Sequence, residues 1–263
     1  MNWLTARRWA LGTCLLAAAV AVAQVDLVYF DENGGGTNPR GLYDFEVASG
    51  KSALRAPVGG SQRFFSLDQR PSDGVVFAAE VVTGNALWTI NIDTGATQFV
   101  VNHGLPTVAD ISFDPKTNTL YGMTRNAPYQ LYTIDPGTGG STLIGNLANE
   151  VRCGLTFSPS GTLYGFTLTG ALYRIDPKTA GVTLVGDSGA PMSLLEDADF
   201  TPDGRLFAVD WFGYLFQIDP STGARTQVGT TGMGTGLTAV LGIPEPSTVA
   251  LLLAAGAGLR RRR

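Results

Sequence analysis

One short pattern occurs five times along this chain and constrains its fold more than any other feature. A leucine and an aromatic residue are followed by a polar residue, a second large apolar residue and then a glycine-containing turn. The copies begin at Leu42, Leu87, Leu131, Leu172 and Leu215, at spacings of 45, 44, 41 and 43 residues. A period of about 40–50 residues is typical of β-propeller blades, each of which is a small antiparallel sheet. The chain is therefore predicted to be an all-β repeat protein.

Each repeat divides into four short segments with the character of strands. Around Leu172 these segments cover 153–157, 162–166, 171–175 and 182–185. They alternate apolar and polar residues and are bounded by Gly, Pro, Asp and Ser, as strands usually are. The 34 glycines and the 15% of charged residues also fit a turn-rich β protein. We therefore expect blades of four strands.

The two ends of the repeat region complement each other. Residues 26–30 match a second strand without a first strand before it, and 236–241 match a first strand with nothing after it. Pairing them completes one blade from both ends and removes an exposed sheet edge. The prediction is a five-bladed β-propeller over 24–243, closed by strand sharing between the termini. The predicted blades are 26–58 with 236–242, 61–104, 107–147, 151–189 and 193–231.

The turn after the third strand has its own signature, Asp-Pro-x-Thr-Gly in its fullest form. The aspartate is expected to accept hydrogen bonds from the backbone amides ahead of it, and proline presets the next φ angle. Glycine suits the left-handed position that returns the chain. Calcium binding is the alternative, but each turn offers one carboxylate where calcium takes six to eight oxygens. We interpret these turns as structural corners of the blades.

The N-terminus has the features of a secretory signal. Arg7 and Arg8 precede an apolar run over 9–22, and Ala21 and Ala23 form a small-x-small cleavage site before Gln24. A signal helix over 1–23 and export of the remaining chain are therefore predicted.

The C-terminus carries the most specific motif. Pro244-Glu245-Pro246 precedes an apolar segment over 249–259 and four arginines at 260–263. This arrangement resembles the PEP-CTERM sorting signal of Gram-negative bacteria. The resemblance implies processing by an exosortase at the inner membrane, then release or attachment at the envelope, outer surface or extracellular matrix, in systems linked to exopolysaccharide and biofilm. Eleven apolar residues span roughly 17 Å as a helix, well short of a ~30 Å hydrocarbon core, which favours a transient sorting helix over a permanent anchor.

Charge and cysteine content narrow the classes of partner. Removing both terminal segments takes away six arginines and one glutamate, which leaves 12 basic and 21 acidic residues and a net charge of −9. Nucleic acid is therefore not an expected partner, and the membrane is expected to be contacted only through the terminal segments. Cys153 is the one cysteine left after signal removal, so no disulfide and no cysteine-based metal site is predicted.

Candidate ligand residues lie in the loops that propellers place at one end of the central channel. The predicted ligand-binding residues are Asp31, Glu80, Arg125, Asp210 and Trp211. Asp110 and Asp197 are candidate metal ligands, with calcium the possible ion and no other cofactor expected. Trp211, Phe212 and Tyr214 form an aromatic group that suits sugar rings, with packing between blades as the alternative. A solvated acidic rim is the alternative for the carboxylates.

No catalytic residue is assigned. The single histidine, His103, has no Gly-x-Ser-x-Gly motif to accompany it, so a Ser-His-Asp triad lacks support. The repeats are similar to bacterial propellers of the WD-repeat, quinoprotein and gluconolactonase-like groups, but lack their diagnostic residues. Three functions are considered: a non-catalytic exported protein that binds a polysaccharide or an envelope protein, a metal-dependent lactonase or related hydrolase whose carboxylates converge at the channel mouth, and a structural matrix protein.

Overall fold

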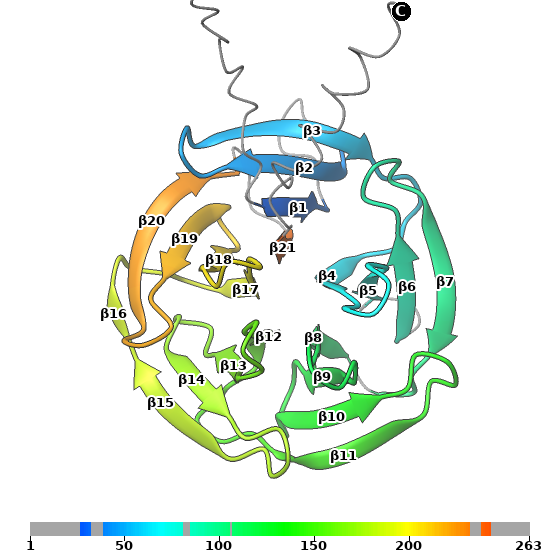
Figure 1. Cartoon of the computed structure of the whole chain (residues 1–263), viewed down its shortest axis with the longest axis vertical. Helices are drawn as coiled ribbons and strands as arrows, with labels where there is room; N and C mark the ends of the chain where they lie inside the picture. Colours follow the sequence, from blue (N-terminus) through cyan, green and yellow to red (C-terminus); the bar gives the residue numbers. More distant parts are fainter. Residues whose placement is uncertain (1–26, 33–38, 81–84, 106, 232–237, 243–263) are drawn as a thin grey trace, which may run out of the picture.

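The structure, a computed structural model, describes residues 27–32, 39–80, 85–105, 107–231 and 238–242. Twenty-one strands and no helix occur in these ranges. The strands form five sheets arranged around a central axis (Figure 1). The predicted five-bladed β-propeller is therefore confirmed.

The strands of each blade follow one another in space from the central channel to the outer rim. In that order, the first blade contains β21 (Thr238–Gly242), β1 (Leu27–Asp31), β2 (Gly41–Glu46) and β3 (Lys51–Pro57). The second contains β4 (Phe64–Gln69), β5 (Val76–Glu80), β6 (Ala86–Ile90) and β7 (Thr97–Asn102). The third contains β8 (Val108–Phe113), β9 (Leu120–Thr124), β10 (Gln130–Ile134) and β11 (Ser141–Asn146).

The last two blades follow the same order. The fourth contains β12 (Cys153–Phe157), β13 (Leu163–Phe166), β14 (Leu172–Ile175) and β15 (Val182–Gly186). The fifth contains β17 (Leu195–Phe200), β18 (Leu206–Asp210), β19 (Tyr214–Ile218) and β20 (Ala224–Thr230). Its outer edge also pairs in parallel with β16 (Ser188–Gly189), a two-residue strand that the sequence did not predict.

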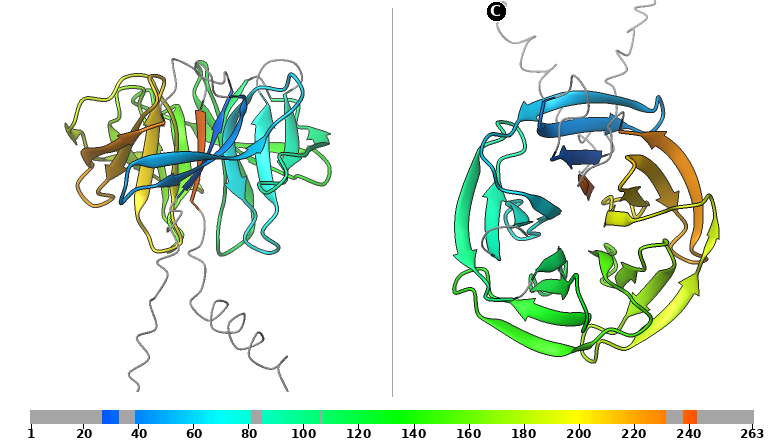
Figure 2. Two further views of the ribbon diagram at one scale, coloured as in Figure 1. Left: turned by 90° about the horizontal axis from the view of Figure 1, so that it is seen from above. Right: turned by 180° about the vertical axis from the view of Figure 1, so that it is seen from behind.

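Strand sharing closes the propeller as predicted. β21, from the end of the chain, pairs antiparallel with β1, from its beginning, with Thr238 opposite Asp31 and Gly242 opposite Leu27. Figure 2 shows β21 in the innermost position of this blade, next to β1. The first blade therefore ties together two segments that are more than 200 residues apart, which leaves no incomplete blade in the ring.

The core lies between the blades. Five buried apolar clusters each combine residues of two neighbouring blades, so every sheet packs both of its faces against another sheet. The inner strands β1, β5, β8 and β18 are consequently buried along their whole length, whereas β7 and β11 are exposed or half-buried. The alternation of apolar and polar residues in the sequence therefore does not correspond to one buried and one solvent-exposed face on the inner strands.

The outer strands bend around the circumference (Figures 1 and 2). In all five blades the pairing between the third and fourth strands shifts register directly after the repeated leucine, which leaves one extra residue on the outer strand. A β-bulge of this kind bends its strand and increases its twist. The repeated bulge thus lets each outer strand follow the rim of the disc.

The predicted turn mechanism is confirmed. Asp135 accepts hydrogen bonds from the backbone N–H of Gly137 (2.8 Å) and the hydroxyl of Thr138 (2.8 Å). Asp219 makes the equivalent contacts with Ser221 and Thr222. The turn also docks on the preceding blade, since a Cβ on Gly139 would lie 2.1 Å from the carbonyl oxygen of Asn102 at the end of β7. The turn therefore joins neighbouring blades at their outer corner.

Both predicted targeting segments lie outside the described residues. These are the signal over 1–23 with its cleavage residues Ala21 and Ala23, and the tail over 244–263 with Pro244, Glu245 and Pro246. Within the described ranges, no helix has the length and apolar character needed to cross a membrane.

Candidate functional site

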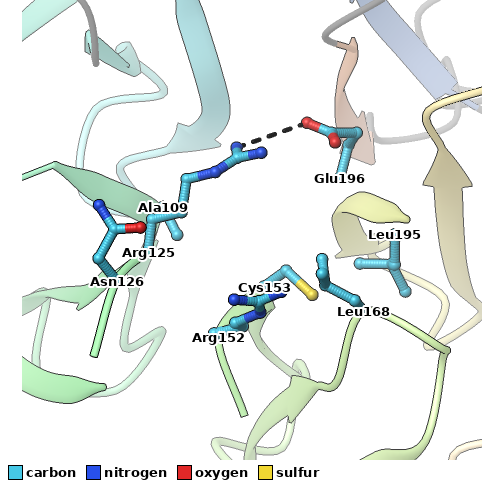
Figure 3. Close-up of a pocket in the computed structure, with 8 residues that line it drawn as sticks. All are labelled: Ala109, Arg125, Asn126, Arg152, Cys153, Leu168, Leu195 and Glu196. Atoms are coloured by element: carbon cyan, nitrogen blue, oxygen red, sulfur yellow. Dashed lines mark ion pairs between the residues drawn. The ribbon is translucent and has the colours of Figure 1, made fainter. Parts of the chain in front are cut away.

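A small cavity lies at the end of the channel where the innermost strands begin. Its volume is about 50 Å³. It is lined by Ala109, Arg125, Asn126, Arg152, Cys153, Leu168, Leu195 and Glu196 (Figure 3). These residues come from the third, fourth and fifth blades, so the cavity exists only in the assembled propeller. We call it the mouth cavity.

β-Bulges in the innermost strands direct side chains to this end of the channel. β4, β8 and β17 each carry one extra residue relative to the second strand of their blade, and these residues are Phe65, Ala109 and Glu196. A bulge re-aims the side chain at the extra position. Glu196 is the one charged member of this set and lines the mouth cavity together with Ala109.

Arg125 faces Glu196 across the mouth cavity (Figure 3). A guanidinium nitrogen of Arg125 lies 3.8 Å from a carboxylate oxygen of Glu196, which makes an ion pair without a short hydrogen bond. The guanidinium also stacks 4.4 Å from the ring centroid of Phe65. The Glu196 side chain is only 3% exposed, and its burial raises its pKa to about 7, although Arg125 opposes the shift.

Arg152 supplies a second cationic group to the same cavity. Its guanidinium donates a hydrogen bond to the hydroxyl of Tyr129 (3.0 Å) and lies 5.4 Å from the centroid of that ring. The neighbouring Cys153 is buried, and its thiol donates to the carbonyl of Phe166 at 3.4 Å. Burial raises the pKa of this thiol well above its ordinary value, which makes Cys153 a poor nucleophile.

Of the predicted ligand-binding residues, Arg125 lines the mouth cavity, and three carboxylates instead lie at the ends of second strands. Asp31, Glu80 and Asp210 end β1, β5 and β18 and are all buried. Glu80 accepts a hydrogen bond from the indole N–H of Trp88 (2.8 Å). Asp210 accepts from the backbone N–H groups of Phe212 (3.0 Å) and Tyr214 (2.9 Å) and so shapes its own turn. These hydrogen bonds give Glu80 and Asp210 a structural role.

Trp211 follows Asp210 on the rim beside the mouth cavity. Its backbone N–H donates to the carbonyl of Leu194 (2.9 Å), immediately before the cavity residues Leu195 and Glu196. Trp211 is half-buried, whereas Phe212 and Tyr214 are each 44% exposed. Phe212 and Tyr214 therefore present surface to solvent, and they follow Trp211 at the end of the blade where Leu195 and Glu196 line the cavity.

Asp110 and Asp197, the predicted metal ligands, lie deeper in the channel wall. Asp110 accepts hydrogen bonds from the Ser66 hydroxyl on the preceding blade and from the backbone N–H of Leu155 (2.7 Å) on the following blade. It is also hydrogen-bonded to Asp197, and its burial raises its pKa. The carboxylate of Asp110 thus serves as a bridge between innermost strands.

Similar bridges continue around the channel. Asp68 accepts from the backbone N–H of Phe113 (2.5 Å), Ser112 accepts from that of Phe157 (3.0 Å), and Thr156 donates to Asp199 (2.9 Å). The partners are 43–45 residues apart, which is one blade. The innermost strands are sheet edges, and buried edge amides need hydrogen-bond partners. We call this set, with Ser66, Asp110 and Leu155, the channel girdle.

The structure does not assemble the predicted metal cluster. In the described ranges, no three His, Cys, Asp or Glu side chains are grouped closely enough to hold a metal ion. The convergence of Asp31, Glu80, Asp110, Asp197 and Asp210 at one metal therefore does not occur. The reason is that Asp110 belongs to the channel girdle and is hydrogen-bonded to Asp197, whereas the other three carboxylates end second strands.

His103 has a structural environment. It is 2% exposed, and its Nδ1 accepts the backbone N–H of Leu105 (3.3 Å). Burial lowers its pKa to about 4, so the imidazole is neutral at physiological pH. Because Nδ1 is occupied by a backbone donor, the arrangement lacks the carboxylate-oriented imidazole of a hydrolytic triad.

Sequence reasoning did not assign Arg152 and Glu196 to a shared site. Both were recognisable as charged residues beside the start of an innermost strand. The bulge that aims Glu196 into the mouth cavity depends on strand register, which the repeat period does not reveal.

Comparison with known proteins places the chain in a family. A family model described as a repeat of unknown function (DUF6923) matches residues 29–196, well over half of the chain. The chain belongs to the DUF6923 family. No curated protein matches the sequence.

Two examples of solved structures with a fold similar to that of this DUF6923 protein come from otherwise different proteins. One is a chain of the crystal structure of a nidogen/laminin complex, with a TM-score of 0.53 and 10% identity over 82% of this chain and 98% of that chain. The other is XC5397 from Xanthomonas campestris, a gluconolactonase, with a TM-score of 0.50 and 16% identity over 74% of this chain and 70% of that one. At these identities the similarity shows the propeller fold alone.

Proposed function

We propose that this DUF6923 protein is a non-catalytic binding propeller, exported to the cell envelope or extracellular matrix, whose ligand occupies the channel mouth. The mouth cavity is the observation that carries the proposal. It brings Arg125, Arg152 and Glu196 together from three blades, and the exposed residues Phe212 and Tyr214 lie in the loop and strand start that follow Asp210 at the same end of the fifth blade. Concave sites with a few convergent polar groups are the usual place for a ligand in such folds.

Export is supported by the two terminal motifs. Ala21 and Ala23 fit signal cleavage, and Pro244-Glu245-Pro246 with its apolar segment and arginines resembles an exosortase substrate. On this proposal the partners during sorting are the secretion machinery and an exosortase at the inner membrane of a Gram-negative bacterium. Deleting 244–263 is expected to change the distribution between cells and medium, and an unchanged distribution would count against the sorting assignment.

A polysaccharide is the ligand class that we favour over an envelope protein. Aromatic rings near charged and amide groups suit sugar rings, and Trp211, Phe212 and Tyr214 lie at the same end of the propeller as the cavity residues Arg125 and Asn126. An association with exopolysaccharide is also what the sorting-signal resemblance implies.

A larger hollow of about 800 Å³ lies along the second blade, at the end that carries its β4–β5 and β6–β7 turns. It is lined mainly by turn residues around 73–76 and 89–98. It contains no opposed cations, so it provides a weaker case for a specific ligand than the mouth cavity.

The metal-dependent lactonase and the structural matrix protein remain the alternatives. The lactonase requires a carboxylate set at one metal, and the described residues provide no group of three potential ligands. Calcium and EDTA titrations, followed by melting temperature, test this alternative together with elemental analysis. A calcium-dependent rise in melting temperature and a stoichiometric bound metal would favour the lactonase.

Co-sedimentation of the secreted, processed protein with matrix polysaccharide tests the proposed function. Replacing Trp211 and Phe212 by alanine is expected to lower the bound fraction at least tenfold. Phe99→Ala is a matched control, because Phe99 is also exposed but lies on the outer strand β7. Equal binding of both variants, or no binding by the natural chain, would contradict a polysaccharide site at the mouth and leave the structural matrix role.

A further inference from the structure

The mouth cavity gathers positive charge in a protein domain that is otherwise acidic. Arg125 and Arg152 both line a space of about 50 Å³, and a buried glutamate closes it on the side of the fifth blade. The region between the predicted cleavage sites carries 21 acidic and 12 basic residues. Two arginines that converge on one small cavity in such a domain therefore indicate a specific anionic group rather than a general affinity for anions.

We propose that the mouth cavity binds a carboxylate group, as carried by the uronic-acid units of an acidic polysaccharide, and that Glu196 takes up a proton from solvent when this group binds. The inference rests on the proposed function, because it names the chemical class of the ligand at that same site.

Size and geometry favour a carboxylate. A space of about 50 Å³ holds a few water molecules, which corresponds to a small planar group and excludes a whole sugar ring. The ring would then lie outside the cavity, on the side where Trp211 is held against Leu194. Guanidinium groups present their N–H donors in a planar fork that matches a carboxylate.

Arg125 is held in place without being saturated. Its guanidinium stacks on Phe65 at 4.4 Å, which fixes the plane of the group through a cation–π contact. The contact with Glu196 is 3.8 Å long and leaves most of its five N–H donors available to a closer acceptor. A ligand carboxylate can therefore replace Glu196 as the principal partner of Arg125.

The same geometry requires Glu196 to change its protonation. Its side chain is 3% exposed, so a second carboxylate in the cavity would face it without intervening bulk water. Two carboxylates that face each other in one small cavity disfavour ionisation of the weaker acid, which here is Glu196. The pKa of Glu196, already raised to about 7 by burial, would rise further in the complex. Binding is therefore coupled to proton uptake and weakens as pH rises above 7.

Other charged groups lie near the Glu196 carboxylate, and their titration must be distinguished from that of Glu196. Arg125 and Arg63 are cations near its carboxylate, and Asp210 is an anion near it. Cys153 and Arg152 line the same cavity, and Asp110 lies close to Cys153. Burial raises the pKa of Asp110 and of Asp210 as well, so the test needs a variant that removes only the Glu196 titration.

Isothermal titration with D-glucuronate and D-glucose tests the carboxylate, because these sugars differ at one carbon. The processed full-length protein is expected to bind glucuronate at least tenfold more tightly than glucose at pH 6. Arg125→Gln and Arg152→Gln are each expected to weaken glucuronate binding at least tenfold. Arg174→Gln, at an exposed position on β14, is the matched control and should leave the affinity unchanged.

The pH dependence tests Glu196. The dissociation constant for glucuronate is expected to rise by up to about tenfold per pH unit above 7, because the carboxylate of glucuronate stays ionised throughout this range. Glu196→Gln cannot titrate and should bind glucuronate with an affinity that changes less than twofold between pH 6 and pH 8. A pH dependence that persists in Glu196→Gln would overturn the role of this residue.

The outcomes separate this inference from the proposed function. Equal affinity for glucose and glucuronate would overturn the carboxylate site while leaving a polysaccharide-binding propeller intact. Selective binding of glucuronate without any binding of matrix polysaccharide would support the carboxylate site and contradict the proposed function. Failure to bind either sugar, with polysaccharide still retained, would also overturn the carboxylate site.

Discussion

Ala180 occupies a left-handed turn position directly against Gly145 of the preceding blade. Its φ angle is 60°, and the equivalent positions in the other four blades hold Gly50, Gly95, Gly139 and Gly223, with φ angles of 65–75°. A Cβ on Gly145 would lie 3.1 Å from the Cβ of Ala180. The methyl group thus lies on the turn of the fourth blade, and the third-blade strand that receives this turn carries a glycine.

This pairing predicts an energetic coupling between the two positions. Gly145→Ala should lower the free energy of unfolding by about 1–3 kcal/mol, because the new methyl meets Ala180 and the carbonyl oxygen of Thr179 at 2.9 Å. Ala180→Gly should change it by less than about 1 kcal/mol, since relief of the left-handed strain offsets the lost buried methyl. In the double variant a coupling of at least about 0.5 kcal/mol is expected from urea unfolding, and strict additivity would contradict the contact.

Docking of the turn on the neighbouring blade predicts a larger effect at Gly139. Gly139→Ala should cost about 3 kcal/mol or more, because the methyl would overlap the carbonyl oxygen of Asn102 at 2.1 Å. Gly204→Ala is the control, since Gly204 also has a positive φ angle, 89°, but no atom within 4 Å of its Cβ position. It should show only the conformational cost of about 1–2 kcal/mol. Thermal unfolding of both variants measures the difference, and equal losses would show that the turn does not dock.

The channel girdle predicts that a buried hydroxyl contributes more to the free energy of unfolding than an exposed one does. Thr156→Val keeps the shape of the side chain but removes the donor to Asp199, so the free energy of unfolding should fall by about 1–3 kcal/mol. Thr183→Val, at an exposed site on β15, should change it by less than about 0.5 kcal/mol. Urea unfolding at pH 7 provides the comparison. A loss at Thr156 no larger than that at Thr183 would argue against the girdle as a source of stability.

The raised pKa of Glu196 predicts a definite sign for the pH dependence of stability. A carboxyl group with a higher pKa when folded binds more protons in the folded chain, so its contribution is complete below about 4.5 and declines as pH rises through about 7. The natural chain should lose on the order of 3 kcal/mol more than Glu196→Gln between pH 4.5 and pH 8. Part of the decline should persist in the variant, because burial also raises the pKa values of Asp68 and Asp110.

Urea unfolding at pH 4.5, 6 and 8 measures this decline. Glu150→Gln, at an exposed loop position, should keep the slope of the natural chain. Identical slopes for Glu196→Gln and the natural chain would mean that Glu196 titrates normally in the folded protein.

Much of the fold could be predicted because it depends on local and periodic features of the sequence. The repeated leucines indicated the number of blades, the unmatched strands at 26–30 and 236–241 indicated the closure, and the aspartate turns followed from residues within three positions of each other. In the site, Arg125 could be predicted at the channel mouth because it lies in a loop between a second and a third strand.

The sequence by itself therefore determined the five-bladed ring, its closure and its corner turns, since each depends on spacing or on contacts between near neighbours in the chain. Tertiary structure alone decided that Glu196 points into the mouth cavity, that Asp110 bridges innermost strands and that Gly145 receives Ala180. The physical reason is that these features depend on strand register and on partners about one blade away in sequence. A periodic pattern shows that blades repeat, but it does not show which side chains meet when two blades pack together.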